Sequence, residues 1–110
     1  MSEDIRKLLG VIEKIRDNGK IVKGINEVTK AVERGVAKLV IYADDVDPKE
    51  IIMHLPMICK EKDIECLTVP SKSELGKSVG VPVACSSIAI LDFGESGDEI
   101  KQLLKSIQKN

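Results

Sequence analysis

Apolar residues recur along this chain with two different spacings, and the two alternate. Spacing of three to four residues is typical of an amphipathic helix, whereas short continuous runs rich in β-branched residues are typical of buried strands. The first pattern, or a capping sequence at its start, predicts helices over residues 4–17, 24–34, 47–58, 71–79 and 98–108. The second predicts strands over residues 21–22, 38–43, 65–69 and 86–93.

The expected helix ends carry recognisable signals. Asn18-Gly19 ends the first helix and Gly35 ends the second. Asp47 caps the third helix, with Pro48 at its first position. Its apolar stripe is Ile51, Ile52, Leu55 and Ile58, and Pro56 is expected to disturb its hydrogen-bond ladder. The fourth helix begins with the capping-box sequence Ser-Lys-Ser-Glu at residues 71–74.

Alternating strands and helices predict an α/β fold. The pattern indicates a three-layer α/β/α sandwich with a mixed, roughly four-stranded central sheet, in which residues 38–43 form a central strand. At least some strand pairs are expected to be parallel and joined by right-handed helical crossovers. The pattern leaves the strand order open. A length of 110 residues fits a single domain, residues 1–110.

Composition narrows the possible chemistry. The chain has one Tyr, one Phe and no Trp, so the core is expected to be aliphatic and no aromatic platform for stacking bases is expected. The three cysteines lack the C-x-x-C spacing of a zinc site and indicate a reducing compartment. No signal peptide or run of about 18 apolar residues is visible. We therefore expect a cytoplasmic protein without metal or cofactor.

Charge is distributed unevenly. The formal net charge is −1, which argues against a protein that coats nucleic acid without selectivity. Between residues 20 and 38, however, five basic residues face two acidic ones, an excess of three positive charges. Because local potential decides docking, this segment is a candidate anion-binding surface. A solvated helix face remains the alternative.

Three features of the sequence resemble enzyme motifs. His54, the single histidine, lies in a predicted helix without a neighbouring Ser or Cys nucleophile, which favours a structural role. Asp44-Asp45 follows a buried strand, as phosphoacceptor or metal-binding carboxylates do, but the sequence that follows favours turn-and-cap chemistry. Residues 76–80 lack the first glycine of a phosphate loop, since no glycine stands five residues before Gly76. We expect no enzyme activity.

The start of the predicted helix 24–34 groups three polar side chains. Asn26 and Glu27 lie in its first turn and Lys30 follows one turn later, on the side opposite the apolar residues. Free N–H groups at a helix start favour anions, and an amide, a carboxylate and an ammonium group can contact a guanine edge beside a phosphate. This predicts recognition of unpaired or non-canonically paired RNA. A capped helix whose polar side faces water is the alternative.

Several segments, in order, resemble a known family. They are KGINEVTKAVERGVAKLV at residues 23–40, ADDVDP at 43–48, HLP at 54–56, CKEK at 59–62, SKSELGK at 71–77 and GVPV at 80–83. Together they are similar to the kink-turn RNA-binding proteins, in particular to the family of the archaeal large-subunit ribosomal protein L7Ae within the L7Ae/L30e superfamily. The resemblance implies an α/β/α sandwich that grips the kink-turn, an RNA bend with a short bulge beside tandem sheared G·A pairs.

The resemblance also implies roles for individual residues. Asn26 and Glu27 would contact the guanines of the G·A pairs, with Lys30 beside them, and Gly24 would allow close approach of the backbone. The remaining implied positions serve the bulged nucleotide (Asp47, Ile51), the phosphates (Lys72) and the flipped-out base (Val81, Pro82, Val83). Apart from the resemblance, Lys23 and Arg34 are expected to add positive charge to the RNA-binding surface. This chain departs from the family pattern at Pro82 and Ala84.

Such proteins serve several particles. The resemblance implies roles in the ribosome, in box C/D and H/ACA small RNA-guided modification particles, and in ribonuclease P with tRNA processing. The expected partners are their kink-turn RNAs and other protein subunits, with no membrane and a monomer when free. The alternative function is a protein-interaction module of the same fold with little intrinsic RNA affinity.

Overall fold

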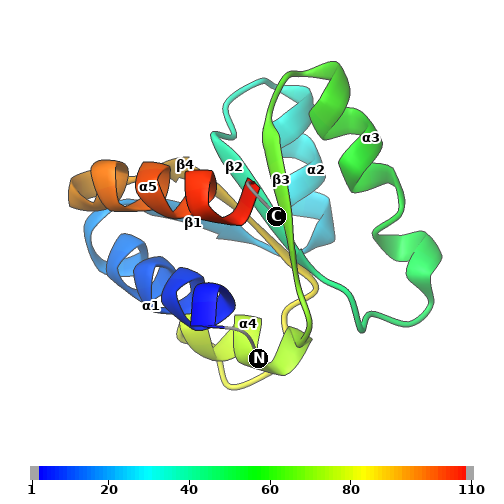
Figure 1. Cartoon of the computed structure of the whole chain (residues 1–110). Coiled ribbons are helices and arrows are strands. Elements are labelled where there is room, and N and C mark those ends of the chain that lie inside the picture. Colours follow the sequence, from blue (N-terminus) through cyan, green and yellow to red (C-terminus); the bar gives the residue numbers. More distant parts are fainter. Residues whose placement is uncertain (1–2, 109–110) are drawn as a thin grey trace.

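In the computed structural model, which describes residues 3–108, a four-stranded sheet forms the centre of the molecule (Figure 1). Its strands are β1 (Lys20–Lys23), β2 (Leu39–Ala43), β3 (Glu65–Val69) and β4 (Ser87–Asp92), and their order is β1-β4-β2-β3. The strand β4 pairs antiparallel with both β1 and β2, whereas β2 and β3 are parallel. The sheet is therefore mixed, as predicted, and the order of its strands is now defined.

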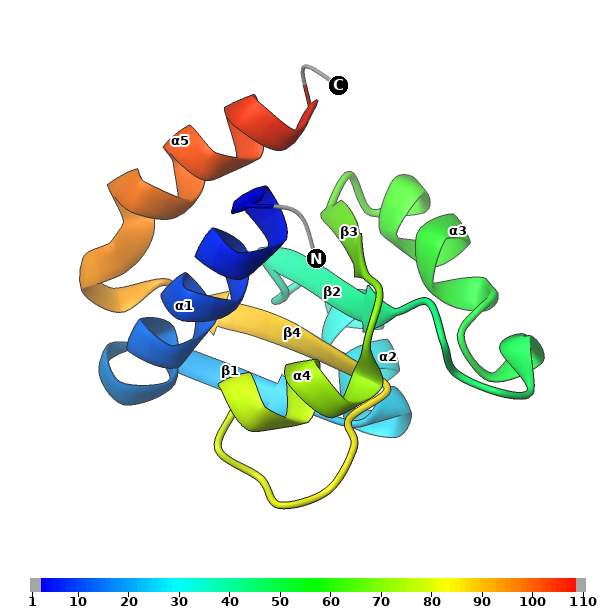
Figure 2. The same cartoon turned by 60° about the horizontal axis from the view of Figure 1, so that its bottom comes forward.

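Helices cover both faces of the sheet (Figure 2). The helices α1 (Glu3–Asn18), α4 (Lys72–Ser78) and α5 (Gly97–Gln108) pack together on one face. The helices α2 (Ile25–Glu33) and α3 (His54–Glu61) contact each other on the opposite face. Two short 3-10 turns, η1 (Lys49–Ile51) and η2 (Gly94–Ser96), complete the described chain. This arrangement confirms the three-layer α/β/α sandwich.

The core is aliphatic, as the composition predicts. The central strand β2 contributes Leu39, Val40 and Ile41, all fully buried, and β4 contributes Ile88 and Ile90. Burying each such side chain contributes roughly 1.5–3 kcal/mol relative to exposure. Both central strands are buried on two faces because helices cover each side, which explains their uninterrupted apolar runs. None of the helices in the described part is long and apolar enough to span a membrane.

The expected helix over residues 47–58 is wrong. Asp47 makes no capping bond, Pro48 precedes the short turn η1, and the α-helix begins only at His54. Pro56 is the third residue of α3, where backbone N–H groups have no partner within the helix, so the expected disturbance of the ladder is also wrong. Ile51, expected on the buried stripe, is 40% exposed.

Candidate functional site

One edge of the sheet collects the ends of three strands. Because β1 and β2 are both antiparallel to β4, and β3 is parallel to β2, their carboxyl ends lie at the same edge as the start of β4. Backbone bonds join the segments beyond them: Gly24 N–H donates to the Ser87 carbonyl at 3.0 Å, and Asp44 N–H to the Val69 carbonyl at 2.8 Å. Most of the predicted site residues follow or precede these strand ends. The fold therefore assembles them from distant parts of the sequence.

Gly24 turns the chain from β1 into α2. Its φ of +91° and ψ of 150° lie in a region that only glycine adopts readily. Gly24 is the N-cap of α2 and has no side chain to cap it, while its carbonyl accepts the Val28 N–H at 2.9 Å. The first N–H groups of α2 therefore lack a side-chain cap from the described residues, and they carry the positive end of the helix dipole.

The predicted polar corner is present on α2. Asn26, Glu27 and Lys30 are all exposed, whereas Val28 and Val32 on the opposite side are fully buried. The Lys30 Nζ lies 3.7 Å from a Glu27 carboxylate oxygen, and each side chain remains more than half exposed. An exposed pair of this kind contributes little to stability, so both groups are free to exchange partners.

A shallow pocket of about 270 Å³ lies beside Gly24. It is lined by the end of β1, by Gly24 and by the loop before β4: Lys23, Gly24, Val81, Val83, Ala84, Cys85 and Ser86. Val83 is 67% exposed, an unusual position for a large aliphatic side chain. The pocket joins the predicted loop to the predicted helix start, with apolar and polar groups side by side.

Cys85 lies at the base of this pocket as a neutral thiol. Burial raises the pKa of the Cys85 thiol, an effect opposed by hydrogen bonding to the backbone of Ser87 and Gly24. Its Sγ donates to the Ser87 carbonyl at 3.2 Å. Cys85 therefore acts as a small apolar wall rather than as a nucleophile.

Lys72 is fixed at the same edge by its backbone. Its N–H donates to Asp45 Oδ1 at 2.8 Å, and its carbonyl accepts the Cys85 N–H at 3.0 Å. The next residues follow the capping sequence, because Ser71 Oγ accepts the Glu74 N–H at 3.2 Å. Asp45 thus adds a second cap to α4 besides Ser71, which agrees with the turn-and-cap interpretation of Asp44-Asp45 but at a helix distant from it in the sequence.

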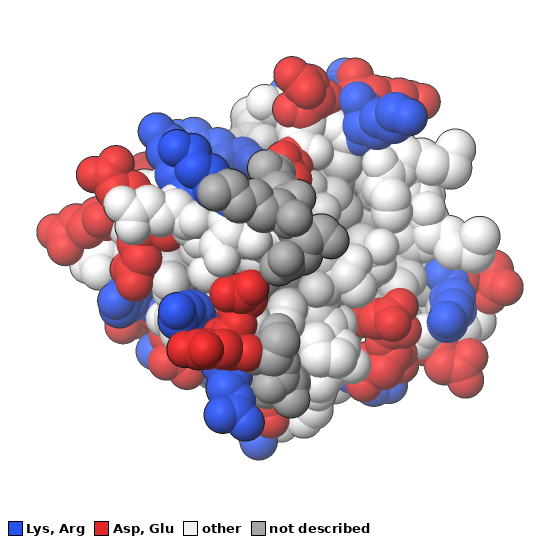
Figure 3. All heavy atoms as spheres, in the orientation of Figure 1, with Lys and Arg blue, Asp and Glu red and all other residues white. Residues whose placement is uncertain are grey.

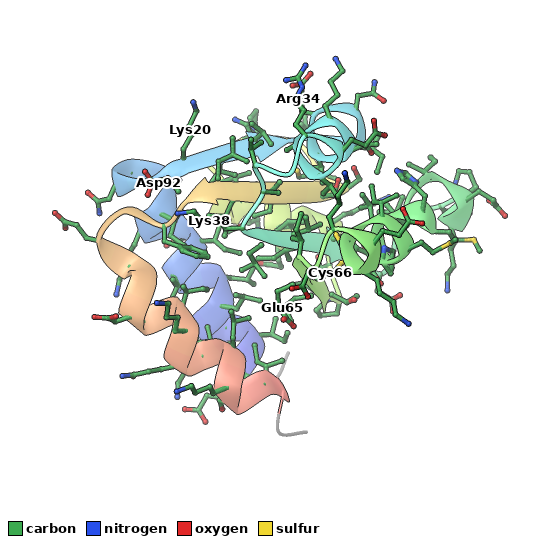
Figure 4. The ribbon with its side chains drawn as sticks, turned by 90° about the horizontal axis from the view of Figure 1, so that it is seen from above. Lys20, Arg34, Lys38, Glu65, Cys66 and Asp92 are labelled. Atoms are coloured by element: carbon green, nitrogen blue, oxygen red, sulfur yellow. The ribbon has the colours of Figure 1, made fainter. Side chains whose placement is uncertain are left out.

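Other predicted residues lie outside this cluster. Arg34 is at the far end of α2, about 15 Å from Gly24 at 1.5 Å per residue. Figure 4 labels Arg34 at the end of α2. It also labels Lys20 at the start of β1 and Lys38 just before β2, which are the strand ends away from Gly24. Asp47 and Ile51 are exposed in and before η1, and no hydrogen bond or ion pair in the described structure joins either side chain to α2.

On the face that Figure 3 shows, charge is mixed rather than segregated. Figure 3 shows acidic and basic side chains interspersed on one face of the molecule, with broad uncharged areas between them. Among residues 3–108, no group of three or more His, Cys, Asp and Glu side chains is arranged to hold a metal ion.

Sequence reasoning missed three contributors to this edge. Asp45 anchors Lys72, and Cys85 and Ser86 line the pocket. The position of Asp45 directly after a buried strand was a usable signal, because the carboxyl ends of parallel strands share an edge. Nothing local indicated Cys85 or Ser86, since their placement depends on β4 lying between β1 and β2.

Comparisons with protein families and with solved structures both give matches. Residues 6–100 match the ribosomal protein L7Ae/L30e/S12e/Gadd45 family. Among solved structures, the chain is similar to the Giardia lamblia 15.5kD RNA binding protein, with 31% sequence identity and a TM-score of 0.79. That similarity covers 99% of this chain and 89% of the other.

Proposed function

The chain belongs to the ribosomal protein L7Ae/L30e/S12e/Gadd45 family, and on that premise we propose that it binds RNA and recognises kink-turns. The observation that carries this proposal is the uncapped start of α2, where Asn26, Glu27 and Lys30 are exposed beside the Gly24 pocket. The similarity to a protein titled an RNA binding protein adds support.

Recognition of sheared G·A pairs is assigned to the first turn of α2. The Asn26 amide donates to guanine O6 or N7, and the Glu27 carboxylate accepts from guanine N–H groups. Lys30 and the free N–H groups of the turn contact neighbouring phosphate. Because no Cβ projects from Gly24, the RNA backbone approaches this turn closely.

The loop before β4 is assigned to an unstacked base. Val81 and Val83 offer apolar contact, and Pro82 between them restricts the loop and reduces the entropy lost on binding. Lys23 and Lys72 contact phosphates at this edge. Asp47 and Ile51 contact the bulged nucleotide from η1, and Arg34 extends the positive surface along α2.

Binding of this kind changes the shape of the RNA. A ligand shifts an equilibrium between extended and kinked RNA only by the difference in its affinity for the two forms. Moving the RNA from almost wholly extended to almost wholly kinked takes about 5.5 kcal/mol of differential binding. The contacts assigned to Asn26 and Glu27 exist only with sheared G·A pairs, so they contribute to that difference.

The proposed role is architectural, with catalysis left to partners. We propose that the protein folds RNA in the ribosome, in box C/D and H/ACA particles and in ribonuclease P, and that it acts in the cytoplasm as a monomer when free. Other subunits of these particles then bind the ordered RNA–protein surface.

The test is titration of the protein with two RNAs of equal length, followed by gel shift or calorimetry. One contains a kink-turn, and in the other the G·A pairs are replaced by Watson–Crick pairs and the bulge is removed. Binding at least a hundredfold tighter to the kink-turn is the expected result. Equal affinity for the two would overturn the proposal and favour the alternative, a protein-interaction module.

A further inference from the structure

A chain of two hydrogen bonds joins α3 to the first turn of α2. The Thr29 hydroxyl donates to the Ile25 carbonyl at 2.7 Å, four residues earlier in the same helix. The same Oγ1 lies 2.9 Å from Nε2 of His54, the first residue of α3. Thr29 and His54 are both half-buried between the two helices.

The direction of these bonds follows from the hydrogens available. A threonine hydroxyl has one hydrogen, and the 2.7 Å contact with the Ile25 carbonyl uses it, because a carbonyl only accepts. Thr29 Oγ1 must then accept from His54, so His54 carries a hydrogen on Nε2. Donation runs from His54 through Thr29 to Ile25.

The first turn of α2 needs such support. Its N-cap is Gly24, which has no side chain, so the usual bond from a capping side chain to the turn is missing. Leaving the N–H groups uncapped keeps them free for a ligand but removes the group that normally orders the turn. The Ile25 carbonyl, held by Thr29 from the inner side of the helix, lies next to Asn26 in this turn.

We propose that His54 and Thr29 are positioning residues for RNA recognition: they brace the open first turn of α2 from its buried side, so that Asn26 and Glu27 meet the RNA in a fixed geometry. This inference rests on the proposed function, since it concerns the same site. The proposal gives His54, the single histidine, a specific role: it donates a hydrogen bond to Thr29 on α2 and is not a catalytic group.

The experiment compares variants that remove or keep the two bonds. Thr29→Val and His54→Phe remove them, whereas Thr29→Ser keeps the hydroxyl and His54→Gln keeps an N–H near the position of Nε2. Thr68→Val is the matched control, because Thr68 is exposed on β3. Each variant is titrated with the kink-turn RNA and with the Watson–Crick stem, after circular dichroism has verified its fold.

We expect Thr29→Val and His54→Phe to weaken kink-turn binding about three- to tenfold, the size of one hydrogen bond, and to leave binding of the plain stem within about twofold. Thr29→Ser, His54→Gln and Thr68→Val should stay near wild type. His54→Phe supplies an independent result should Thr29→Val fail to fold. Equal losses on both RNAs, or no loss on either, would overturn the positioning role.

A second measurement does not depend on RNA. Hydrogen exchange of the Val28 amide, which bonds to the Gly24 carbonyl, should accelerate several-fold in Thr29→Val and His54→Phe. Unchanged exchange overturns the brace itself. If the wild-type protein shows no preference for the kink-turn, the proposed function fails together with the positioning role, and Val28 exchange alone then reports whether the brace exists.

Discussion

Glu27 is the residue from which the proposed specificity most directly follows. Its carboxylate is exposed at the first turn of α2 and held only by a surface contact with Lys30. Truncation by Glu27→Ala removes the acceptor for guanine N–H groups, and we expect a loss of about 1–3 kcal/mol in kink-turn binding with weaker preference for G·A pairs. Calorimetric titration measures both quantities.

The control for this change is on the same helix. Glu33 is exposed at the last residue of α2, so Glu33→Ala removes the same charge away from the proposed contacts. It should leave the preference for G·A pairs unaltered. If Glu27→Ala discriminates between the two RNAs as wild type does, Glu27 does not contact the bases.

Alanine variants of Gly24 and Gly35 distinguish the cost of backbone strain from the effect of a Cβ on close approach of the RNA. Their φ values are +91° and +72°, and in both cases an added Cβ meets no atom within 4 Å. Gly24→Ala and Gly35→Ala should each destabilise the fold by about 1–3 kcal/mol, because alanine disfavours these conformations. Urea unfolding measures this cost. Only Gly24→Ala should also weaken kink-turn binding, and a similar loss with Gly35→Ala would mean that stability alone explains it.

At this scale the sequence predicts the site in part. Gly24, Asn26, Glu27 and Lys30 are close together in the chain, so helical periodicity alone places the three polar side chains on one face. The contact of Asp45 with Lys72 joins residues 27 positions apart, and no local rule predicts it. Interactions within one turn of a helix are readable from sequence, whereas those that depend on strand pairing are not.

Among the elements, α3 shows how a correct apolar pattern still misplaces a helix start. Ile52, Leu55 and Cys59 are buried, so the predicted amphipathic character is present. The predicted start of this helix is wrong because Asp47-Pro48 resembles a helix start but precedes only η1. Pro56 was the better start signal, because proline is tolerated in the first turn of a helix and not in its interior.

Two helical glycines should respond to alanine with opposite signs. At Gly10 in α1 an added Cβ meets no atom within 4 Å, so Gly10→Ala should stabilise the protein by about 1 kcal/mol through helix propensity. At Gly76 in α4 a Cβ would collide with the Val83 carbonyl oxygen, so Gly76→Ala should destabilise by about 1–3 kcal/mol. Thermal unfolding of both variants measures the two signs.

The Gly76 variant has a second expected effect. The Val81 N–H donates to the Gly76 carbonyl at 3.1 Å, and Val83 lines the pocket beside Gly24. Displacing this loop should weaken RNA binding, whereas Gly10→Ala on the opposite face of the sheet from α2 should not. Stabilisation by Gly76→Ala would contradict the close packing between α4 and the loop.

For the whole molecule, strand order decides where the site forms. Alternation of helices and strands predicts the α/β/α sandwich, but it does not predict that β4 lies between β1 and β2. That insertion brings Cys85 and Ser86 beside Gly24, more than 60 residues earlier in the chain. Which strands pair depends on burial of the whole sheet, and that burial cannot be predicted from any single segment of the sequence.

The net charge of the protein leads to a prediction about the salt dependence of RNA binding. At −1, the protein has no overall positive field to attract RNA, so the salt dependence of binding should come from a few local contacts. Lys72→Ala should weaken kink-turn and plain stem alike and lower the slope of log affinity against log salt by roughly one. Lys101→Ala, an exposed lysine on α5, should leave the slope unchanged. Titration across a salt series decides, and an equal slope for wild type and Lys72→Ala would remove Lys72 from the phosphate contacts.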